Sequence, residues 1–393
     1  MRITSIILLL FACTANLSAG NFVEIKNTGG KYTIKNTAVK SNRKSIVPGF
    51  TENKIDELIF SNELLKKFLE EKKAVSFYLG KSKKDQNIEA WFFPGTSEKK
   101  ALVIGGVHGS ELSSVEVAQA LIQKLLQKEK SYYNVIIIPC LFPDNSALAK
   151  EKKNQIGSTA NIGRYSFSAA ADPNRQMPTP GEPFYEDLAK DHFGREIEQE
   201  NRLLLQLINS YKPERIASIH AIRDVTHAGI YADPRTDSKG YALGFETDSM
   251  LAIEMSKMIK NSNGFVPGNF LEKKPTALYF KDPVPVPKGE FQERNFSGSI
   301  LPGNRGSGIS LGTWVSTAIA SATDPLSNRN AMRILTIEFP GYKRSADYKI
   351  AKQKNYFHLQ VQLYASAIEN IFLEKYFIEE NEINPSVNLA SAE

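Results

Sequence analysis

The sequence contains five histidines, and two of them stand where an apolar segment ends. His108 follows the apolar segment ALVIGGV and precedes Glu111 by three residues, and His220 follows the segment IASI. Ligands collect at strand ends near the switch point of an open parallel sheet, so the two histidines could converge. Two imidazoles and one carboxylate form a set that binds zinc and leaves a fourth position for water. These residues predict a hydrolytic zinc site, although a strand-end histidine is often only a hydrogen-bonded core residue.

A carboxylate in a third apolar segment supplies the base that such a site needs. Glu338 lies inside TIEFPG, where a bare carboxylate is costly to bury unless a metal, a water or a cation pairs with it. A carboxylate held beside a zinc-bound water acts as a general base. We therefore expect Glu338 to take part in catalysis.

An amide and a guanidinium stand side by side in the segment DPNRQMP. Asn174 and Arg175 are suited to fixing a carboxylate, because a guanidinium pairs with it through two parallel hydrogen bonds. The alternatives are a surface ion pair for Arg175 and a turn cap for Asn174.

The elements that must position these side chains alternate between strands and helices. Apolar residues recur at helical spacing over 55–69, 112–126, 197–211, 250–259 and 356–376. The apolar runs ALVIGGV, VIIIPC, RIASIH and ILTIEF suit strands buried on both faces, and AVSFYLG and IEAWFF precede them as further strands. Strand, helix and strand in succession predict parallel crossovers. We therefore expect a single three-layer α/β/α domain with a mostly parallel mixed central sheet.

Three segments outside this pattern complete the expected organisation. Residues 1–19 have the layout of a signal peptide, because an apolar run of about half a membrane span follows Arg2 and precedes small and polar residues. Residues 20–73 are expected to form a polar, mobile leader and a packing helix, and 74–393 the catalytic domain. The Pro- and Gly-rich stretch 263–312 is predicted to be a long loop. Cys13 raises the alternative of a lipid anchor.

The amino-acid composition of the chain argues against several classes of function. The 393 residues include 49 Lys and Arg against 43 Asp and Glu, and the lysines are scattered, which argues against a nucleic-acid partner. The apolar run at the N-terminus is too short for a membrane anchor, so we expect no transmembrane segment in the mature chain and an exported, periplasmic or secreted protein. Only Cys140 remains after cleavage, so no intrachain disulfide is expected. A core of this size needs no metal for its stability, so a metal would serve chemistry.

Six motifs, in order, resemble those of the zinc metallocarboxypeptidases, the family of pancreatic carboxypeptidase A. The resemblance runs from about residue 80 to residue 342. The motifs are GKSKKDQNIEA, the HxxE of GGVHGSE, FPDN, the D-x-NR of DPNR, SIHA and TIEFPGY. FPDN departs from the family's turn by lacking its final glycine, and Pro173 occupies the variable position of D-x-NR.

The resemblance implies a role for each matching residue. His108, Glu111 and His220 would bind one zinc ion per chain, and Glu338 would activate the water. Asn174 and Arg175 would hold the terminal carboxylate of the substrate. Arg164, which lies ten residues before Asn174, would polarise the scissile carbonyl. The 117 residues between His220 and Glu338 exceed the family's usual number, and the substrate-facing tyrosine could be Tyr231, Tyr241 or Tyr279.

Together these features predict a zinc-dependent hydrolase that removes a C-terminal residue from a peptide, or from a muropeptide of peptidoglycan if the chain is exported. Two alternatives stay open at the level of sequence. One is an acylase of the succinylglutamate desuccinylase or aspartoacylase kind, which shares the zinc motif. The other is a catalytically silent peptide-binding module, which would have no need of Glu338.

Overall fold

The computed structural model describes the chain with gaps. The described residues are 21–28, 31–38, 58–128, 130–156, 162–165, 171–244, 246–269, 271 and 308–375. The predicted signal peptide, Cys13 and most of the predicted loop at 263–312 lie outside them. Among the described residues, no helix is both long and apolar enough to cross a bilayer.

Nine strands and seven α-helices are described. The strands are β1 (Asn21–Thr28), β2 (Lys31–Ala38), β3 (Val75–Lys81), β4 (Asn87–Phe93), β5 (Lys100–Ile104), β6 (Asn134–Ile138), β7 (Arg215–Ile222), β8 (Gly229–Ala232) and β9 (Arg333–Pro340). The helices are α1 (Asn62–Glu71), α2 (Leu112–Leu125), α3 (Pro143–Glu151), α4 (Gln199–Tyr211), α5 (Glu246–Asn261), α6 (Leu311–Val315) and α7 (Ala351–Ala367).

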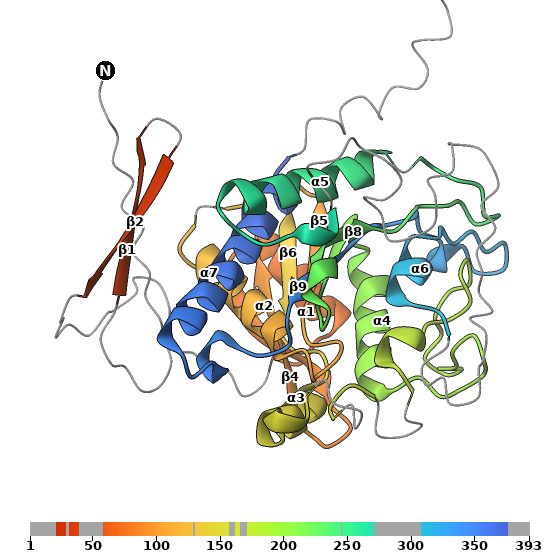
Figure 1. The fold of residues 1–393 in the computed structure, drawn as a ribbon. Helices are drawn as coiled ribbons and strands as arrows, with labels where there is room; N and C mark the ends of the chain where they lie inside the picture. The colour runs from red at the N-terminus through yellow and green to blue at the C-terminus, as the bar shows by residue number, and fades with distance from the viewer. Residues whose placement is uncertain are drawn as a thin grey trace, which may run out of the picture. The chain divides into compact units, whose positions relative to one another are not determined.

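Seven of the strands form one mixed sheet in the order β3-β4-β6-β5-β7-β9-β8. The central strands β6, β5, β7 and β9 are parallel neighbours, and β4 and β8 run opposite to the other strands. The helix α2 connects β5 to the parallel strand β6, as the strand–helix–strand pattern predicts (Figure 1). The mostly parallel mixed sheet predicted from sequence is confirmed.

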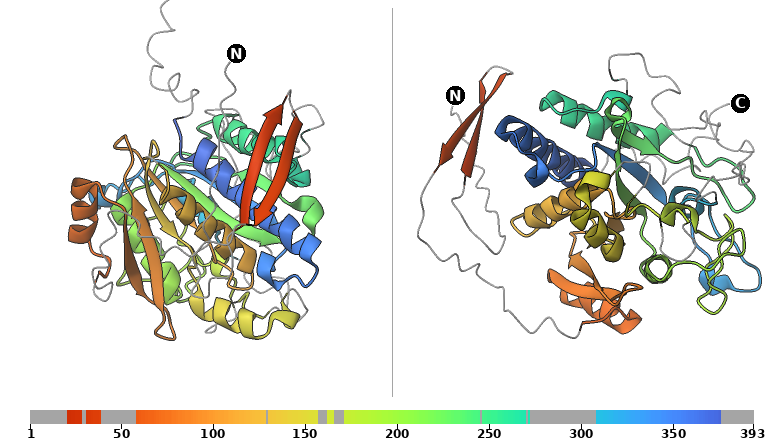
Figure 2. Two further views of the ribbon diagram at one scale, coloured as in Figure 1. Left: turned by 90° about the vertical axis from the view of Figure 1, so that its left-hand side faces the viewer. Right: turned by 60° about the horizontal axis from the view of Figure 1, so that its bottom comes forward.

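Helices cover both faces of this sheet, and successive residues of a buried strand face opposite layers. On β7, Ala217 and Ile219 pack in the cluster that contains α2, α5 and α7, whereas Ile216 packs in the cluster that contains α1, α4 and α6. Figure 2 shows α2 and α7 side by side on the first of these faces. The even-numbered residues of β7 and β9, which include His220 and Glu338, therefore face the layer of α4 and α6.

Several elements differ from the sequence prediction. Within residues 20–73, predicted as a polar leader and a packing helix, β1 and β2 pair as an antiparallel hairpin in a unit that ends at Lys54. The helix α1 packs in the core of the larger unit, through Leu65 and Phe68. The sequence analysis also missed the short elements α3, β8 and α6, which lie outside the apolar runs from which the other strands and helices were predicted.

Candidate metal centre

The candidate metal ligands follow the carboxyl ends of two neighbouring parallel strands. His108 lies four residues after β5, Glu111 directly precedes α2, and His220 lies near the end of β7. Gly106 makes the turn between β5 and His108 with a φ of +63°, and a Cβ there would lie 2.9 Å from the Cα of Cys140. Only glycine suits that position, since it adopts positive φ freely and leaves room for the neighbouring backbone.

The three side chains meet at one buried point. Each offers a ligand atom, and these atoms all lie within 4.8 Å of one another. The two Nδ1 atoms of His108 and His220 are 3.2 Å apart. The Oε1 atom of Glu111 lies 2.8 Å from His108 Nδ1, and its Oε2 atom lies 3.1 Å from His220 Nδ1. Two ring nitrogens and a carboxylate that face a common point can hold a metal ion.

Groups outside this trio fix the orientation of each ligand. The Nε2 atom of His108 donates to Asp172 Oδ1 at 2.8 Å, and Nε2 of His220 lies 3.1 Å from the hydroxyl of Ser218. The backbone N–H of Ala221 donates to Glu111 Oε2 at 2.9 Å. Each imidazole thus keeps its Nδ1 toward the common point, which is how outer partners orient histidine ligands in metal sites.

The charges around His108 favour a cation at this point. Burial alone would lower the pKa of His108, but the carboxylates of Glu111 and Asp172 outweigh it and raise the pKa to about 9. Burial likewise opposes the ionisation of the two carboxyl groups, yet the facing imidazoles hold the pKa of Glu111 well below its usual range. The pKa of Asp172 is also lowered, by His108, Arg164 and Arg175. Two ionised carboxylates in one buried place favour positive charge there, whether on an imidazole or on a bound cation.

Arg164 lies at the same point and bridges the two carboxylates. Its Nη1 atom donates to Glu111 Oε1 at 3.0 Å, and its Nη2 atom donates to Asp172 Oδ2 at 3.3 Å. The side chain is 28% exposed, so one side of the guanidinium faces solvent. The structure therefore places Arg164 beside the candidate ligands.

Asn174 and Arg175 occupy the short turn that begins after Asp172. Asp172 accepts a hydrogen bond from the backbone N–H of Asn174, and this caps the turn. The side-chain oxygen of Asn174 accepts from the backbone N–H of Leu311, at the start of α6, so the amide nitrogen is left to donate elsewhere. The guanidinium of Arg175 donates to the carbonyl of Asn174 at 2.7 Å. Both residues are half-buried and available on one side.

Glu338 is brought next to the candidate ligands by strand pairing. It is the register partner of His220 in the parallel pair of β7 and β9, so the two side chains leave the same face of the sheet. The charge of Glu338 acts on two tyrosines. Burial and the charge of Glu338 raise the pKa of Tyr231 to about 12, and burial together with Glu111 and Glu338 raises that of Tyr342.

The tyrosine candidates have different positions. Tyr231 is buried on β8, and its hydroxyl donates to the carbonyl of His227 at 2.7 Å. Tyr241 is 44% exposed, and Tyr279 lies outside the described residues. The sequence analysis did not single out Asp172, Ser218 or Tyr342. The first two could have been found from the aspartate of DPNR and from the alternation of SIHA, which places Ser218 on the face of His220.

Comparisons with known proteins give structural relatives at low sequence identity. No family model and no curated protein matches the sequence. Carboxypeptidase A from Helicoverpa armigera matches with a TM-score of 0.42 and 14% identity, over 79% of this chain and 73% of that one. Murein-tripeptide amidase MpaA from Escherichia coli O157 matches with a TM-score of 0.35 and 17% identity, over 74% and 91%. Bovine thrombin-activatable fibrinolysis inhibitor matches with a TM-score of 0.38 and 12% identity, over 78% and 95%.

A putative carboxypeptidase A from Shewanella denitrificans OS-217 is also among the solved structures to which the chain is similar, with a TM-score of 0.41 and 13% identity, over 88% of this chain and 77% of that one.

Proposed function

We propose that the protein is a zinc-dependent hydrolase that removes a C-terminal residue from a peptide or a muropeptide. One observation supports this most strongly. The three side chains that can hold a metal ion, those of His108, Glu111 and His220, converge beside Glu338 on the same face of the sheet. A binding module would need neither the ligand set nor a carboxylate beside it.

The residues present fit zinc. Two nitrogen ligands and one oxygen ligand match the set that zinc takes in hydrolases, which leaves a position open for water and substrate. The imidazoles are held by Asp172 and Ser218 so that their Nδ1 atoms face each other at 3.2 Å. Two ring nitrogens this close must share either a proton or a cation. The carboxylates that raise the pKa of His108 favour positive charge between them.

The chain's own residues then carry out the reaction. When bound, zinc would act as a Lewis acid on the scissile carbonyl and lower the pKa of a water molecule. Glu338 takes a proton from the attacking water and passes it to the leaving amine. The solvent-facing side of Arg164 stabilises negative charge that develops on the carbonyl oxygen, because a guanidinium donates charge-assisted hydrogen bonds to an oxyanion.

The carboxylate of the residue to be released would pair with Arg175. The charge of its guanidinium helps to lower the pKa of Asp172, the residue that bonds the candidate ligand His108. The amide nitrogen of Asn174 is directed to donate because its oxygen is occupied by Leu311. A planar guanidinium beside an amide donor suits a carboxylate, which accepts two parallel hydrogen bonds.

The substrate class follows from where the chain is expected to act. The N-terminal sequence predicts export, and we propose a periplasmic or secreted location. Muropeptides of a cell wall would be accessible to an exported hydrolase, so they are tested beside ordinary peptides.

Mass spectrometry of the products tests this proposal. The zinc-loaded protein is incubated with linear peptides, with muropeptides and with small N-acylated amino acids, and a Glu338→Gln variant serves as the matched control. Release of single C-terminal residues by the wild type but not by the variant is expected. Cleavage of acylated amino acids alone would favour the acylase alternative, and no cleavage of any substrate would favour a binding module.

A further inference from the structure

The turn that carries Arg175 is held by a second arginine, Arg195, which lies on the connection between that turn and α4. The Nη2 atom of Arg195 donates to the backbone carbonyl of Arg175 at 2.8 Å. On the other side, the backbone N–H of Arg175 donates to the carbonyl of Asp172 at 2.9 Å. The N–H and the carbonyl of Arg175 are thus both hydrogen-bonded, and these two bonds fix the backbone from which its side chain extends.

A buried carboxylate orients the guanidinium of Arg195. The Nε atom of Arg195 donates to Asp191 Oδ2 at 2.6 Å, and the side chain of Asp191 is only 1% exposed. The Oδ1 atom of Asp191 accepts from the backbone N–H groups of Phe193 and Arg195, each at 2.9 Å. The guanidinium also lies over the ring of Phe193, 5.5 Å from its centroid. The side chain of Arg195 is therefore held along its length before it reaches Arg175.

Backbone contacts tie the loop of residues 191–195 to the segment that follows Arg175. The backbone N–H of His192 donates to the carbonyl of Met177 at 3.1 Å. The N–H of Met177 in turn donates to the carbonyl of Ile309 at 3.2 Å. The position of the loop relative to the Arg175 turn is therefore set by the backbone as well as by the side chain of Arg195.

The backbone of Gly308 packs against the hydrogen bond between the two arginines. A Cβ at Gly308 would lie 2.1 Å from the carbonyl oxygen of Arg175 and 2.7 Å from Nη2 of Arg195. Only glycine leaves room for both atoms at this position. The bonded atoms are therefore covered by backbone, and a hydrogen bond in a setting of lower dielectric is stronger than one in water.

We infer that Arg195 is a positioning residue for the recognition of the substrate's terminal carboxylate. The inference rests on the proposed hydrolase function, in which Arg175 pairs with that carboxylate. A guanidinium donates two parallel hydrogen bonds to a carboxylate only when the two planar groups are aligned, so a displacement of the Arg175 backbone weakens both bonds. Asp191 pairs with Arg195 and compensates its charge, so Arg195 acts through geometry rather than as a second cation for the substrate.

The selectivity of the full-length protein for a free carboxylate tests this inference. The probe is the linear peptide or muropeptide that the zinc-loaded wild type cleaves most rapidly, in its acid form and as its C-terminal amide. The ratio of kcat/KM for acid over amide is measured with both forms in competition, so it does not depend on the fraction of enzyme that is folded. Arg195→Gln should lower this ratio by roughly tenfold, the scale of a weakened charge-assisted hydrogen bond. The loss should appear as a raised KM for the acid form, because the substrate makes this contact before the reaction begins.

Three further variants make the test specific. Arg195→Lys should lose nearly as much selectivity, because an ammonium does not reproduce the fork that bonds Asp191 and the Arg175 carbonyl together, and it decides the question if Arg195→Gln does not fold. In an Arg175→Ala background, Arg195→Gln should not change the ratio further, because the group that it positions is gone. Arg202→Gln is the matched control, at an arginine of α4 that pairs with Glu186 at the surface, and should keep the wild-type ratio.

The outcomes separate this inference from the proposed function. A wild-type preference for the acid that survives Arg195→Gln overturns the inference, and so does an equal loss of kcat/KM for acid and amide, which indicates a structural role alone. Full selectivity in Arg195→Lys also overturns it, since positive charge would then suffice. Equal cleavage of the two forms by the wild type overturns the proposed pairing of the carboxylate with Arg175 itself.

Discussion

His220 on β7 and Glu338 on β9 are register partners in a parallel strand pair, so a candidate metal ligand and a candidate base stand side by side on one face of the sheet. The backbone ladder fixes their relative position, and no loop intervenes. A shift of one residue in that register would turn Glu338 to the opposite face, among the apolar residues packed against α2, α5 and α7. The buried residues on both sides of Glu338, Ile337 and Phe339, hold the register.

Replacing Glu338 by Gln should remove the base and little else. The change is nearly isosteric, so metal content and substrate binding should stay at wild-type levels. We expect kcat to fall by roughly 10²-fold or more, the contribution of a general base. Steady-state kinetics together with metal analysis of both proteins measures this. Ordinary turnover by the variant would place proton transfer on another residue.

Replacing His108 by Ala should release the metal while leaving the fold intact. The two apolar clusters that flank the sheet do not depend on the ion, so the circular dichroism spectrum should match that of the wild type. Elemental analysis after dialysis is expected to give one zinc per wild-type chain and little in the variant. His192→Ala, at a histidine that bonds Thr179 away from the trio, serves as the control and should keep its zinc. Equal zinc in wild type and His108→Ala would remove His108 from the ligand set.

Replacing Asp172 by Asn should weaken metal binding without removing a ligand. Asp172 accepts from Nε2 of His108 at 2.8 Å, and such partners raise the basicity of the imidazole and fix its orientation. We expect the metal dissociation constant to rise by roughly 10- to 100-fold, as is usual for a lost outer partner.

Competition with a fluorescent zinc chelator measures that constant. Asp144→Asn is a matched control, because Asp144 is also a buried aspartate but bonds Ser82, Lys84 and Gln86 instead. That variant should lose stability and keep its metal affinity. If the zinc dissociation constant of Asp172→Asn equals that of the wild type, the role of Asp172 is only to cap the turn at Asn174.

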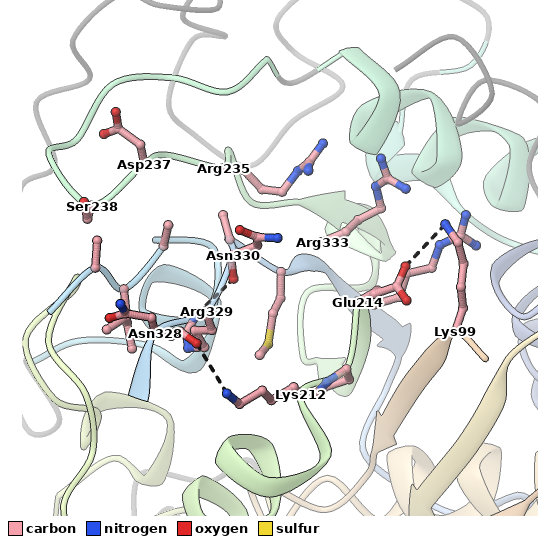
Figure 3. Close-up of a pocket in the computed structure, with 17 residues that line it drawn as sticks. Lys99, Lys212, Glu214, Arg235, Asp237, Ser238, Asn328, Arg329, Asn330 and Arg333 are labelled. Carbon is pink, nitrogen blue, oxygen red and sulfur yellow. Dashed lines mark hydrogen bonds and ion pairs between the residues drawn. The ribbon is translucent and has the colours of Figure 1, made fainter. Parts of the chain in front are cut away.

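The fold was largely predictable from sequence because its strands are buried on both faces. Continuous apolar runs such as those of β5 and β6 have few alternative structures, and the polar residues directly after them stood out. The partners that orient the ligands were harder to find. Asp172 lies 64 residues from His108. The segment directly before Asp172 carries no apolar periodicity, so the sequence does not indicate that the two residues meet. The gathering of lysines and arginines near the amino ends of β5, β7 and β9 (Figure 3) was not predictable, since these residues come from four separated segments and look scattered along the chain.

Replacing Asp248 by Asn should destabilise the fold strongly. Its fully buried carboxylate pairs with Arg235 at 2.7 Å and with the buried Arg333. Removing one partner of a buried ion pair leaves an uncompensated charge and costs about 3–5 kcal/mol. Urea denaturation measures the loss.

The exposed pair of Glu186 and Arg202 provides the control for Asp248. Glu186→Gln should change the free energy of unfolding by no more than about 1 kcal/mol, because solvent screens exposed pairs. If both substitutions lower the free energy of unfolding equally, burial does not make the ion pairs of Asp248 more important for stability than an exposed pair.

Recognition of a terminal carboxylate by Arg175 makes a prediction that separates exopeptidase from endopeptidase activity. Amidation of the substrate's terminal carboxylate should cost a charge-assisted hydrogen bond, about 1.5–3 kcal/mol, and Arg175→Ala should show a matching loss. The half-buried guanidinium keeps its bond to the Asn174 carbonyl when no substrate is bound, so the wild-type fold does not depend on the anion.

A double-mutant cycle on kcat/KM, with acid and amide substrates against wild type and Arg175→Ala, measures the coupling between the two groups. If Arg175 pairs with the carboxylate, the second change costs little once the first has been made, because the interaction is already lost. Losses that simply add would mean that Arg175 does not contact that carboxylate. Equal cleavage of acid and amide by the wild type would indicate an endopeptidase, since an enzyme that cuts within a chain gains nothing from a terminal charge.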